Sequence, residues 1–279
     1  NNTQIRNSTF VQNTGIFGGA VAGANSEGQD VDLHILLCTF IHNSGVLGGA
    51  IWVLSPRNLK VVENVCNSNV ANDTGGCIAV TFDWHSTEHD SVLFANNVMI
   101  SNLAPVGGAV MIDYEANNTY TNNMHTFIGG WFINNTALSQ GGALYINLPA
   151  DPEKSVQREW GSWSKNATER SWLYYGNTNY LYGVTFRGNQ ANSDASSGGA
   201  MVINCGLTTI DSCCFENNRA SSMGGGLLLG APSTALTMRN TSFKSNQARY
   251  GEVIYLSAAG LLELSGNSFT GLSSANEFV

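Results

Sequence analysis

The sequence predicts a single all-β solenoid, a right-handed parallel β-helix of about nine coils. Three observations lead to this fold class: one motif recurs along the chain, most copies are 25–30 residues apart, and short apolar strands replace helical periodicity. This period is too short for a propeller blade. We therefore expect one β-helix domain over residues 1–279, with an inserted loop or subdomain at residues 147–183.

Each copy of the motif reads Phe-x-x-Asn, then four to eight residues, then Gly-Gly-Ala and an apolar strand. A first strand is expected to end at the Phe, as in residues 33–40 and 235–243, and another to follow Gly-Gly. Clear copies begin at Phe10, Phe40, Phe132, Phe186, Phe215 and Phe243. Degenerate copies begin at Val65 and Met99, and an incomplete one at Phe269. The second strands are expected at residues 20–24, 50–55, 77–82, 109–114, 143–148, 200–204 and 226–231.

Every position of the motif has a physical role in stacked coils. The Phe side chains are expected to form an interior column, and the Asn side chains a hydrogen-bonded ladder at a bend. Gly-Gly supplies positive φ and allows close approach of neighbouring coils. The residue after Ala is expected to face inward, which gives a second apolar column: Val21, Ile51, Ile78, Val110, Leu144, Met201, Leu227 and Val253.

In this tandem form, FxxN followed by GGA and an aliphatic residue resembles the repeat of the chlamydial polymorphic outer-membrane proteins. The same repeat is found in extracellular proteins of algae and protists. The resemblance covers about residues 4–270 and implies a right-handed parallel β-helix with adhesive or cell-surface roles. The many glycosylation sequons favour a eukaryotic secretory member of that family.

Composition favours an extracellular glycoprotein that does not bind nucleic acid. Only 11% of residues are charged, the net charge is −8, and no cluster of Lys and Arg occurs. No apolar run is long enough to cross a membrane. Seven Asn-x-Ser/Thr sequons occur, one of them at Asn1, and most coincide with expected turns. We expect N-glycans at Asn7, Asn72, Asn117, Asn134, Asn166 and Asn240.

Five of the six cysteines lie in two local groups. Cys66 could pair with Cys77, and Cys205 could pair with Cys213 or Cys214. Buried free thiols are the alternative. None of the cysteines has the spacing of a zinc site, so we expect no metal and no cofactor.

The expected insertion contains a dense group of aromatic residues. Long loops on a rigid solenoid often carry function, so these residues could bind carbohydrate or a protein neighbour. Alternatively, they could cover the wall of the solenoid itself. Together with two wall residues, they form the candidate binding set: Trp52, Tyr145, Trp160, Trp163, Trp172, Tyr174 and Tyr175.

The sequence does not favour catalysis. Residues 82–90 contain two histidines and three carboxylates, but the segment lies between strands and is interpreted as a solvated loop. A polysaccharide lyase or glycoside hydrolase would need either carboxylates on neighbouring coils of one sheet or a calcium site with a nearby Arg or Lys base. Asp113, Asp211 and Glu263 instead occupy different repeat positions. Enzymatic activity remains an alternative based only on the fold.

We therefore expect a structural or adhesive extracellular glycoprotein, and a subunit of a surface filament is one form it could take. A carbohydrate-binding module is the alternative. Self-association or contact with sister subunits is expected, because the chain begins and ends within the repeat and an outer apolar stripe follows the inward column. That stripe comprises Trp52, Met111, Tyr145, Val202, Leu228 and Ile254.

Overall fold

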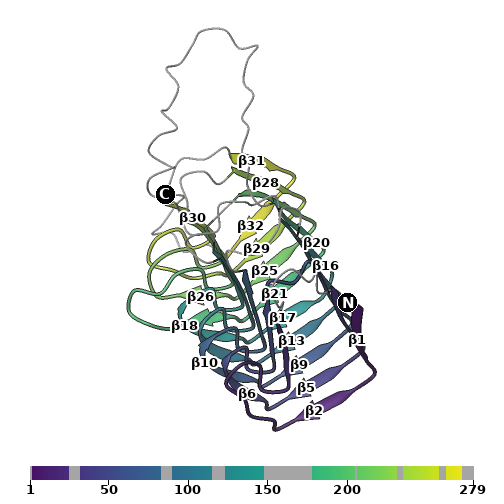
Figure 1. Ribbon diagram of the computed structural model, residues 1–279. Helices are drawn as coiled ribbons and strands as arrows, with labels where there is room; N and C mark the ends of the chain where they lie inside the picture. Colours follow the sequence, from purple (N-terminus) through teal and green to yellow (C-terminus); the bar gives the residue numbers. More distant parts are fainter. Residues whose placement is uncertain are drawn as a thin grey trace, which may run out of the picture.

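The structure, a computed structural model, describes residues 2–24, 32–82, 90–114, 123–147, 178–204, 206–230, 235–257 and 262–271. Within these ranges all regular elements are β-strands, and each strand pairs in parallel with the equivalent strand of the next coil. The coils stack into a rod whose wall consists of four parallel sheets (Figure 1). The predicted fold class, a right-handed parallel β-helix, is confirmed.

Sheets A and B each contain nine strands and extend along the rod. Sheet A comprises β1 (Asn2–Arg6), β4 (Asp32–Leu36), β8 (Asn58–Val62), β12 (Ser91–Ala95), β16 (Met124–Ile128), β20 (Thr178–Tyr182), β24 (Leu207–Asp211), β28 (Ala235–Arg239) and β31 (Leu262–Ser265). Sheet B comprises β2 (Thr9–Val11), β5 (Thr39–Ile41), β9 (Val65–Asn67), β13 (Val98–Ile100), β17 (Trp131–Ile133), β21 (Thr185–Arg187), β25 (Cys214–Glu216), β29 (Ser242–Lys244) and β32 (Ser268–Thr270).

Sheets C and D complete the wall with six and eight strands. Sheet C comprises β6 (Ser44–Leu47), β10 (Val70–Thr74), β14 (Leu103–Val106), β18 (Thr136–Gln140), β22 (Gln190–Ala191) and β26 (Arg219–Ala220). Sheet D comprises β3 (Val21–Ala24), β7 (Ile51–Leu54), β11 (Ile78–Phe82), β15 (Val110–Tyr114), β19 (Leu144–Asn147), β23 (Met201–Ile203), β27 (Leu227–Leu229) and β30 (Ile254–Leu256). The outermost coils lack strands in one or two sheets, so the rod has about seven turns rather than nine.

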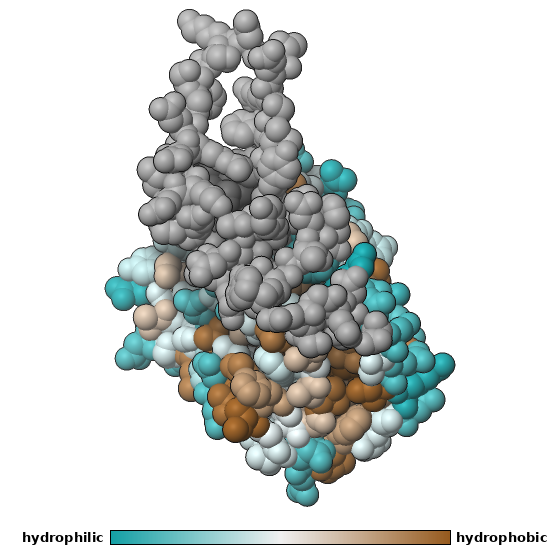
Figure 2. Space-filling view, in the orientation of Figure 1, coloured by the Kyte–Doolittle hydropathy of each residue, from teal (hydrophilic) through white to brown (hydrophobic). Residues whose placement is uncertain are grey.

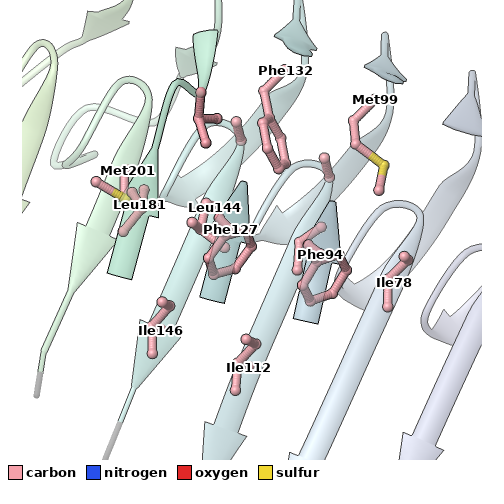
Figure 3. Packing of buried hydrophobic residues seen from close by; sticks show 14 of the residues in the cluster. Ile78, Phe94, Met99, Ile112, Phe127, Phe132, Leu144, Ile146, Leu181 and Met201 are labelled. Atoms are coloured by element: carbon pink, nitrogen blue, oxygen red, sulfur yellow. The ribbon is translucent and has the colours of Figure 1, made fainter. Parts of the chain in front are cut away.

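Alternating side chains fill the interior of the rod. Aliphatic residues of sheet D face aromatic residues of sheets A and B across a dry core (Figure 3). The predicted Phe column is present: the rings of Phe186 and Phe215 lie 4.9 Å apart, and those of Phe215 and Phe243 lie 4.6 Å apart. Parallel in-register pairing places identical residues one strand spacing apart, which allows the rings to stack.

Two register predictions in degenerate copies of the motif are wrong. Cys66, rather than Val65, pairs with Phe40 and occupies the Phe column. In the last full copy, Ile254 rather than Val253 pairs with Leu227 in the inward column. Side chains of a strand alternate between the two faces, so an error of one residue in the register reverses the direction of every side chain. The register could not be assigned in the copies of the motif that lack Phe or Gly-Gly-Ala.

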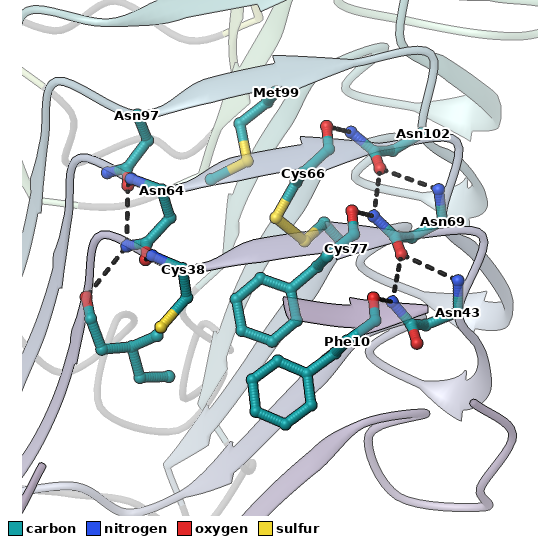
Figure 4. The surroundings of a disulfide bond; sticks show 12 residues. Phe10, Cys38, Asn43, Asn64, Cys66, Asn69, Cys77, Asn97, Met99 and Asn102 are labelled. Carbon is teal, nitrogen blue, oxygen red and sulfur yellow. Dashed lines mark hydrogen bonds between the residues drawn. A yellow bond between two sulfur atoms is a disulfide. The ribbon is translucent and has the colours of Figure 1, made fainter. Parts of the chain in front are cut away.

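An asparagine ladder runs along the corner between sheets B and C. The Oδ1 of Asn69 accepts hydrogen bonds from the Nδ2 of Asn43 at 3.0 Å and from its backbone N at 2.9 Å. The Nδ2 of Asn69 donates to the Oδ1 of Asn102 at 3.0 Å and to the backbone oxygen of Phe40 at 3.0 Å (Figure 4). The same pattern continues through the Asn residues at 135, 189, 218 and 246. The predicted ladder is therefore confirmed, and its amide groups are fully used.

The two glycines of each Gly-Gly pair have different roles at the corner between sheets C and D. Gly48 has a φ of 66°, a conformation that disfavours other residues. A Cβ on Gly49 would lie 2.0 Å from the backbone oxygen of Gly76 in the next coil. The first glycine thus makes the turn, and the second allows the coils to stack.

Candidate functional site

Two corners of the rod have constant geometry. Each of the nine connections from a strand of sheet A to a strand of sheet B contains two residues, and the first of them always has positive φ. The connection from sheet B to sheet C likewise contains two residues, and the second is the ladder Asn. These corners leave little room for insertion, because an extra residue would break the ladder.

The fourth corner, from sheet D to sheet A, varies in length. One connection consists only of residues 55–57, whereas residues 148–177 separate β19 from β20. Residues 25–31, 83–89, 115–122, 231–234 and 258–261 also fall in this connection. The insertion expected at 147–183 is therefore shorter at both ends, because Asn147 ends β19 and residues 178–182 form β20. The longest insertion emerges at this edge of the rod, whereas the corner from sheet C to sheet D lengthens in two coils, at residues 192–200 and 221–226.

A buried polar network joins the strand ends at this edge. The Nε2 of His125 lies 2.7 Å from the hydroxyl of Tyr114, the last residue of β15. The Nδ1 of His125 lies 2.7 Å from the Oδ1 of Asn179, which follows the longest insertion. The Nδ2 of Asn123 donates to Tyr114, and that of Asn179 donates to Thr208. An amide oxygen only accepts, so the His125 proton must lie on Nδ1.

The surroundings of His125 keep its ring neutral. Its side chain is fully buried, and desolvation lowers its pKa to about 4, although the hydrogen bond to Asn179 acts in the opposite direction. The network contacts the ends of residues 115–122 and 148–177. It thus fixes the attachment points of two insertions to the core.

Exposed aromatic side chains lie on the outer wall in the coils before and after the longest insertion. Tyr182 is 46% exposed and Trp131 is 45% exposed. The rings of Tyr180 and Tyr182 are nearly parallel, with an interplanar angle of 2° and a centroid separation of 6.5 Å. The Arg187 guanidinium lies 6.0 Å from the Trp131 ring. Sequence reasoning missed Trp131, which faces outward because it precedes the inward Phe132 in β17.

The structure describes two of the seven predicted binding residues, and it places both on the outer face of sheet D. Trp52 is half-buried against Phe17, with ring centroids 4.7 Å apart. The Tyr145 hydroxyl accepts a hydrogen bond from Asn204 at 3.2 Å. The other five lie outside the described residues: Trp160, Trp163, Trp172, Tyr174 and Tyr175.

The outer apolar stripe is largely buried within the chain, contrary to the exposure that the sequence suggested. Met111, Val202 and Leu228 point outward from sheet D but are only 5%, 1% and 7% exposed. Ile254 lies in the inward column, and Tyr255 takes its place in the stripe. This stripe therefore offers little free apolar surface.

The structure describes some of the predicted glycosylation sites and some of the cysteines that were expected to form disulfide bonds. Asn7, Asn72, Asn134 and Asn240 are exposed, and Asn1, Asn117 and Asn166 lie outside the described residues. Cys66 and Cys77 form a disulfide bond inside the rod (Figure 4). Among the described residues, Cys213 and Cys214 have no disulfide partner, and Cys205 falls outside them.

The described residues hold neither a metal-binding cluster of side chains nor a membrane-spanning helix. No group of three or more His, Cys, Asp and Glu side chains there could hold a metal ion. No helix in those ranges is long and apolar enough to cross a bilayer. The histidines of the predicted loop fall in residues 83–89, outside the described ranges.

Comparison with known proteins gives two family matches. Residues 160–275 match the family model described as the right-handed beta helix region, and residues 132–147 match that of the Chlamydia polymorphic membrane protein repeat. The second match spans Phe132, Asn135 and Gly141-Gly142-Ala143, one copy of the motif. No curated protein and no solved structure matches the chain. The resemblance to this repeat is confirmed, and the chain is a right-handed parallel β-helix of a type that indicates a surface or adhesin-like protein.

Proposed function

We propose that the chain is an extracellular adhesive scaffold, a glycoprotein whose rigid rod presents variable loops along one edge. The observation that carries this proposal is the concentration of the longest connections at the corner between sheets D and A. The corners from sheet A to sheet B and from sheet B to sheet C keep their two-residue geometry, so the loops can change while that part of the frame does not. Binding residues are commonly found on loops held by such rigid scaffolds.

The composition and the exposed sequons support secretion and glycosylation. Four sequon asparagines lie on the outer surface, at Asn7, Asn72, Asn134 and Asn240. Only 11% of the residues are charged, so attached glycans would supply solubility that charge does not. The match to the polymorphic membrane protein repeat supports a cell-surface location.

The proposed role is binding rather than catalysis. Asp113 lies on sheet D, whereas Asp211 and Glu263 lie on sheet A in different coils. Burial raises the pKa of Asp113, and its carboxylate accepts a hydrogen bond from Asn147 at 2.9 Å. These carboxylates do not form the neighbouring pair that glycoside hydrolysis requires.

Loop replacement tests the adhesive function. Residues 148–177 would be replaced by Ser-Pro-Arg, the connection that residues 55–57 already make between the same two sheets. Beads coated with the secreted protein should adhere to intact cells of its source, and the replacement should reduce adhesion while the circular dichroism of the rod is kept. A matched variant shortens residues 115–122 in the same way. Full adhesion after both replacements would contradict the proposal.

Carbohydrate binding is the second candidate function, favoured by the exposed rings of Trp131 and Tyr182 and by the half-buried ring of Tyr180 parallel to that of Tyr182. Parallel exposed aromatic rings offer apolar faces on which sugar rings can stack. On a glycan array, Tyr182→Ala should lose the signal, whereas Leu138→Ala, on an exposed residue of sheet C, should not. An array without any signal for the wild-type protein would contradict this candidate.

A further inference from the structure

Sheet C carries an exposed apolar column on its outer face. Ile16 and Val46 lie in neighbouring coils and are 67% and 38% exposed, and Leu138 on β18, which β10 and β14 separate from β6, is 51% exposed. Leu103, one position away, is 37% exposed. Figure 2 shows hydrophobic side chains gathered over the strands that Figure 1 labels β6 and β10. A contiguous apolar surface of this kind promotes association unless something covers it.

Asn72 interrupts this column. It lies on β10, between Val46 of β6 and the strand β14, in a stretch where the register of β10 shifts against both neighbours. The burial pattern of β10 shows that Asn72 and Asp73 are both exposed. Asn72 also begins an Asn-Asp-Thr sequon. A glycan at this position would project directly from the apolar column.

Thr74, the third residue of the sequon, has a hydroxyl that the fold does not use. Its Oγ1 is buried and finds no hydrogen-bond partner among the described residues. A buried hydroxyl without a partner costs free energy, so valine of the same shape would suit the wall better. Recognition as a glycosylation acceptor requires that hydroxyl, because the sequon needs Ser or Thr at its third position. This second observation supports use of Asn72 as an acceptor.

We infer that Asn72 carries an N-glycan that covers the apolar column of sheet C and prevents the rods from associating side by side. The inference rests on the proposed passage of the chain through the secretory pathway. In the transfer step, the Nδ2 of Asn72 bonds to the anomeric carbon of a lipid-diphosphate-linked oligosaccharide. The lipid diphosphate leaves, and one amide proton is released. The C–H faces of the first sugars then lie over Val46 and Leu138, while their hydroxyls face water.

Two substitutions at Thr74 test the inference with a minimal change in the wall. Thr74→Val removes the acceptor sequence and the unpaired hydroxyl, whereas Thr74→Ser keeps the acceptor sequence. Asn240→Gln is the matched control, because it removes a different exposed sequon. All proteins would be secreted from a eukaryotic host. Mass spectrometry would report site occupancy, sedimentation velocity the oligomeric state, and an apolar-binding fluorescent dye the exposed surface.

We expect only Thr74→Val to lose the Asn72 glycan, bind more dye and sediment as oligomers, with a melting temperature no lower than that of the wild type. Adding Leu138→Ser to Thr74→Val should restore the monomer. If Asn72 is unoccupied while other sequons are occupied, the inference fails and the proposed function stands. If no sequon is occupied, the secretory assignment fails as well. If Asn72 is occupied but Thr74→Val stays monomeric without added dye binding, the covering role is refuted.

Discussion

Removal of one amide from the middle of the asparagine ladder should destabilise the whole rod. Asn135 is fully buried, and its Oδ1 accepts hydrogen bonds from the backbone N of Asn102 at 3.0 Å and from its Nδ2 at 2.9 Å. Its own Nδ2 donates to the Oδ1 of Asn189 at 3.0 Å and to the backbone oxygen of Met99 at 2.9 Å. Asn135→Ala removes all four of these bonds.

The expected cost follows from the groups that lose their partners. Two donors of Asn102 are left facing a buried methyl group, and each buried unsatisfied group costs about 1–3 kcal/mol. The free energy of unfolding should therefore fall by about 2–6 kcal/mol. Asn13→Ala is the matched control within the same ladder. Asn13 donates to Asn43 but accepts no hydrogen bond from another ladder residue, so its loss should cost about 1 kcal/mol or less.

Urea unfolding followed by far-ultraviolet circular dichroism would measure both variants. The β-sheet signal should be retained in the absence of urea, because the rest of the ladder persists. Equal shifts for Asn135→Ala and Asn13→Ala would refute the reasoning, since the two differ chiefly in the hydrogen bonds that they accept. A cost for Asn135→Ala below about 1 kcal/mol would show that water or a shifted amide satisfies the orphaned donors.

Three further predictions concern the core. Phe215→Ala should lower the free energy of unfolding by about 3–5 kcal/mol in a urea titration, because the ring is fully buried between two others. Phe10→Ala should cost less, since only one ring stacks on Phe10. The unfolded state protonates His125 near pH 6.5, but the folded state only near pH 4, so stability should fall by about 3 kcal/mol as the pH drops from 6.5 to 4. His125→Asn should lack this component in melts at several pH values; an unchanged pH dependence would contradict it. Burial raises the pKa of Cys213 to about 12, so iodoacetamide should leave Cys213 unmodified in the native protein. Mass spectrometry would map the alkylated cysteines, and rapid alkylation of Cys213 would contradict its buried position.

The sequence predicted those parts of the rod in which the same residue type recurs at the same position of successive coils. Phe186 and Phe215 stack, and the Asn side chains form a ladder, because parallel in-register pairing repeats the same environment in every turn. Cys66 was missed because a small side chain at the Phe position left no signal to fix the register. Sheet C was also missed, since its strands are only two to five residues long.

The network around His125 could not be derived from the motif. His125 lies on β16 between outward-facing residues, at an inward position that Leu59 and Val92 occupy in earlier coils. Its partners Tyr114 and Asn179 come from different coils and are separated by long insertions. A polar residue in an inward column is a local signal of such a network. Its partners, however, depend on how the coils stack.

The variation at one corner is consistent with the energetics of the rod. Lengthening a connection tenfold, as from residues 55–57 to residues 148–177, raises the entropy cost of loop closure by only about 2 kcal/mol. Loss of one central ladder asparagine costs about the same or more. An insertion into the corner between sheets B and C would disturb such an asparagine, whereas an insertion between sheets D and A leaves the ladder intact. Sequence change should therefore accumulate at the corner where adhesive loops emerge, and the corners from sheet A to sheet B and from sheet B to sheet C should retain their two-residue turns.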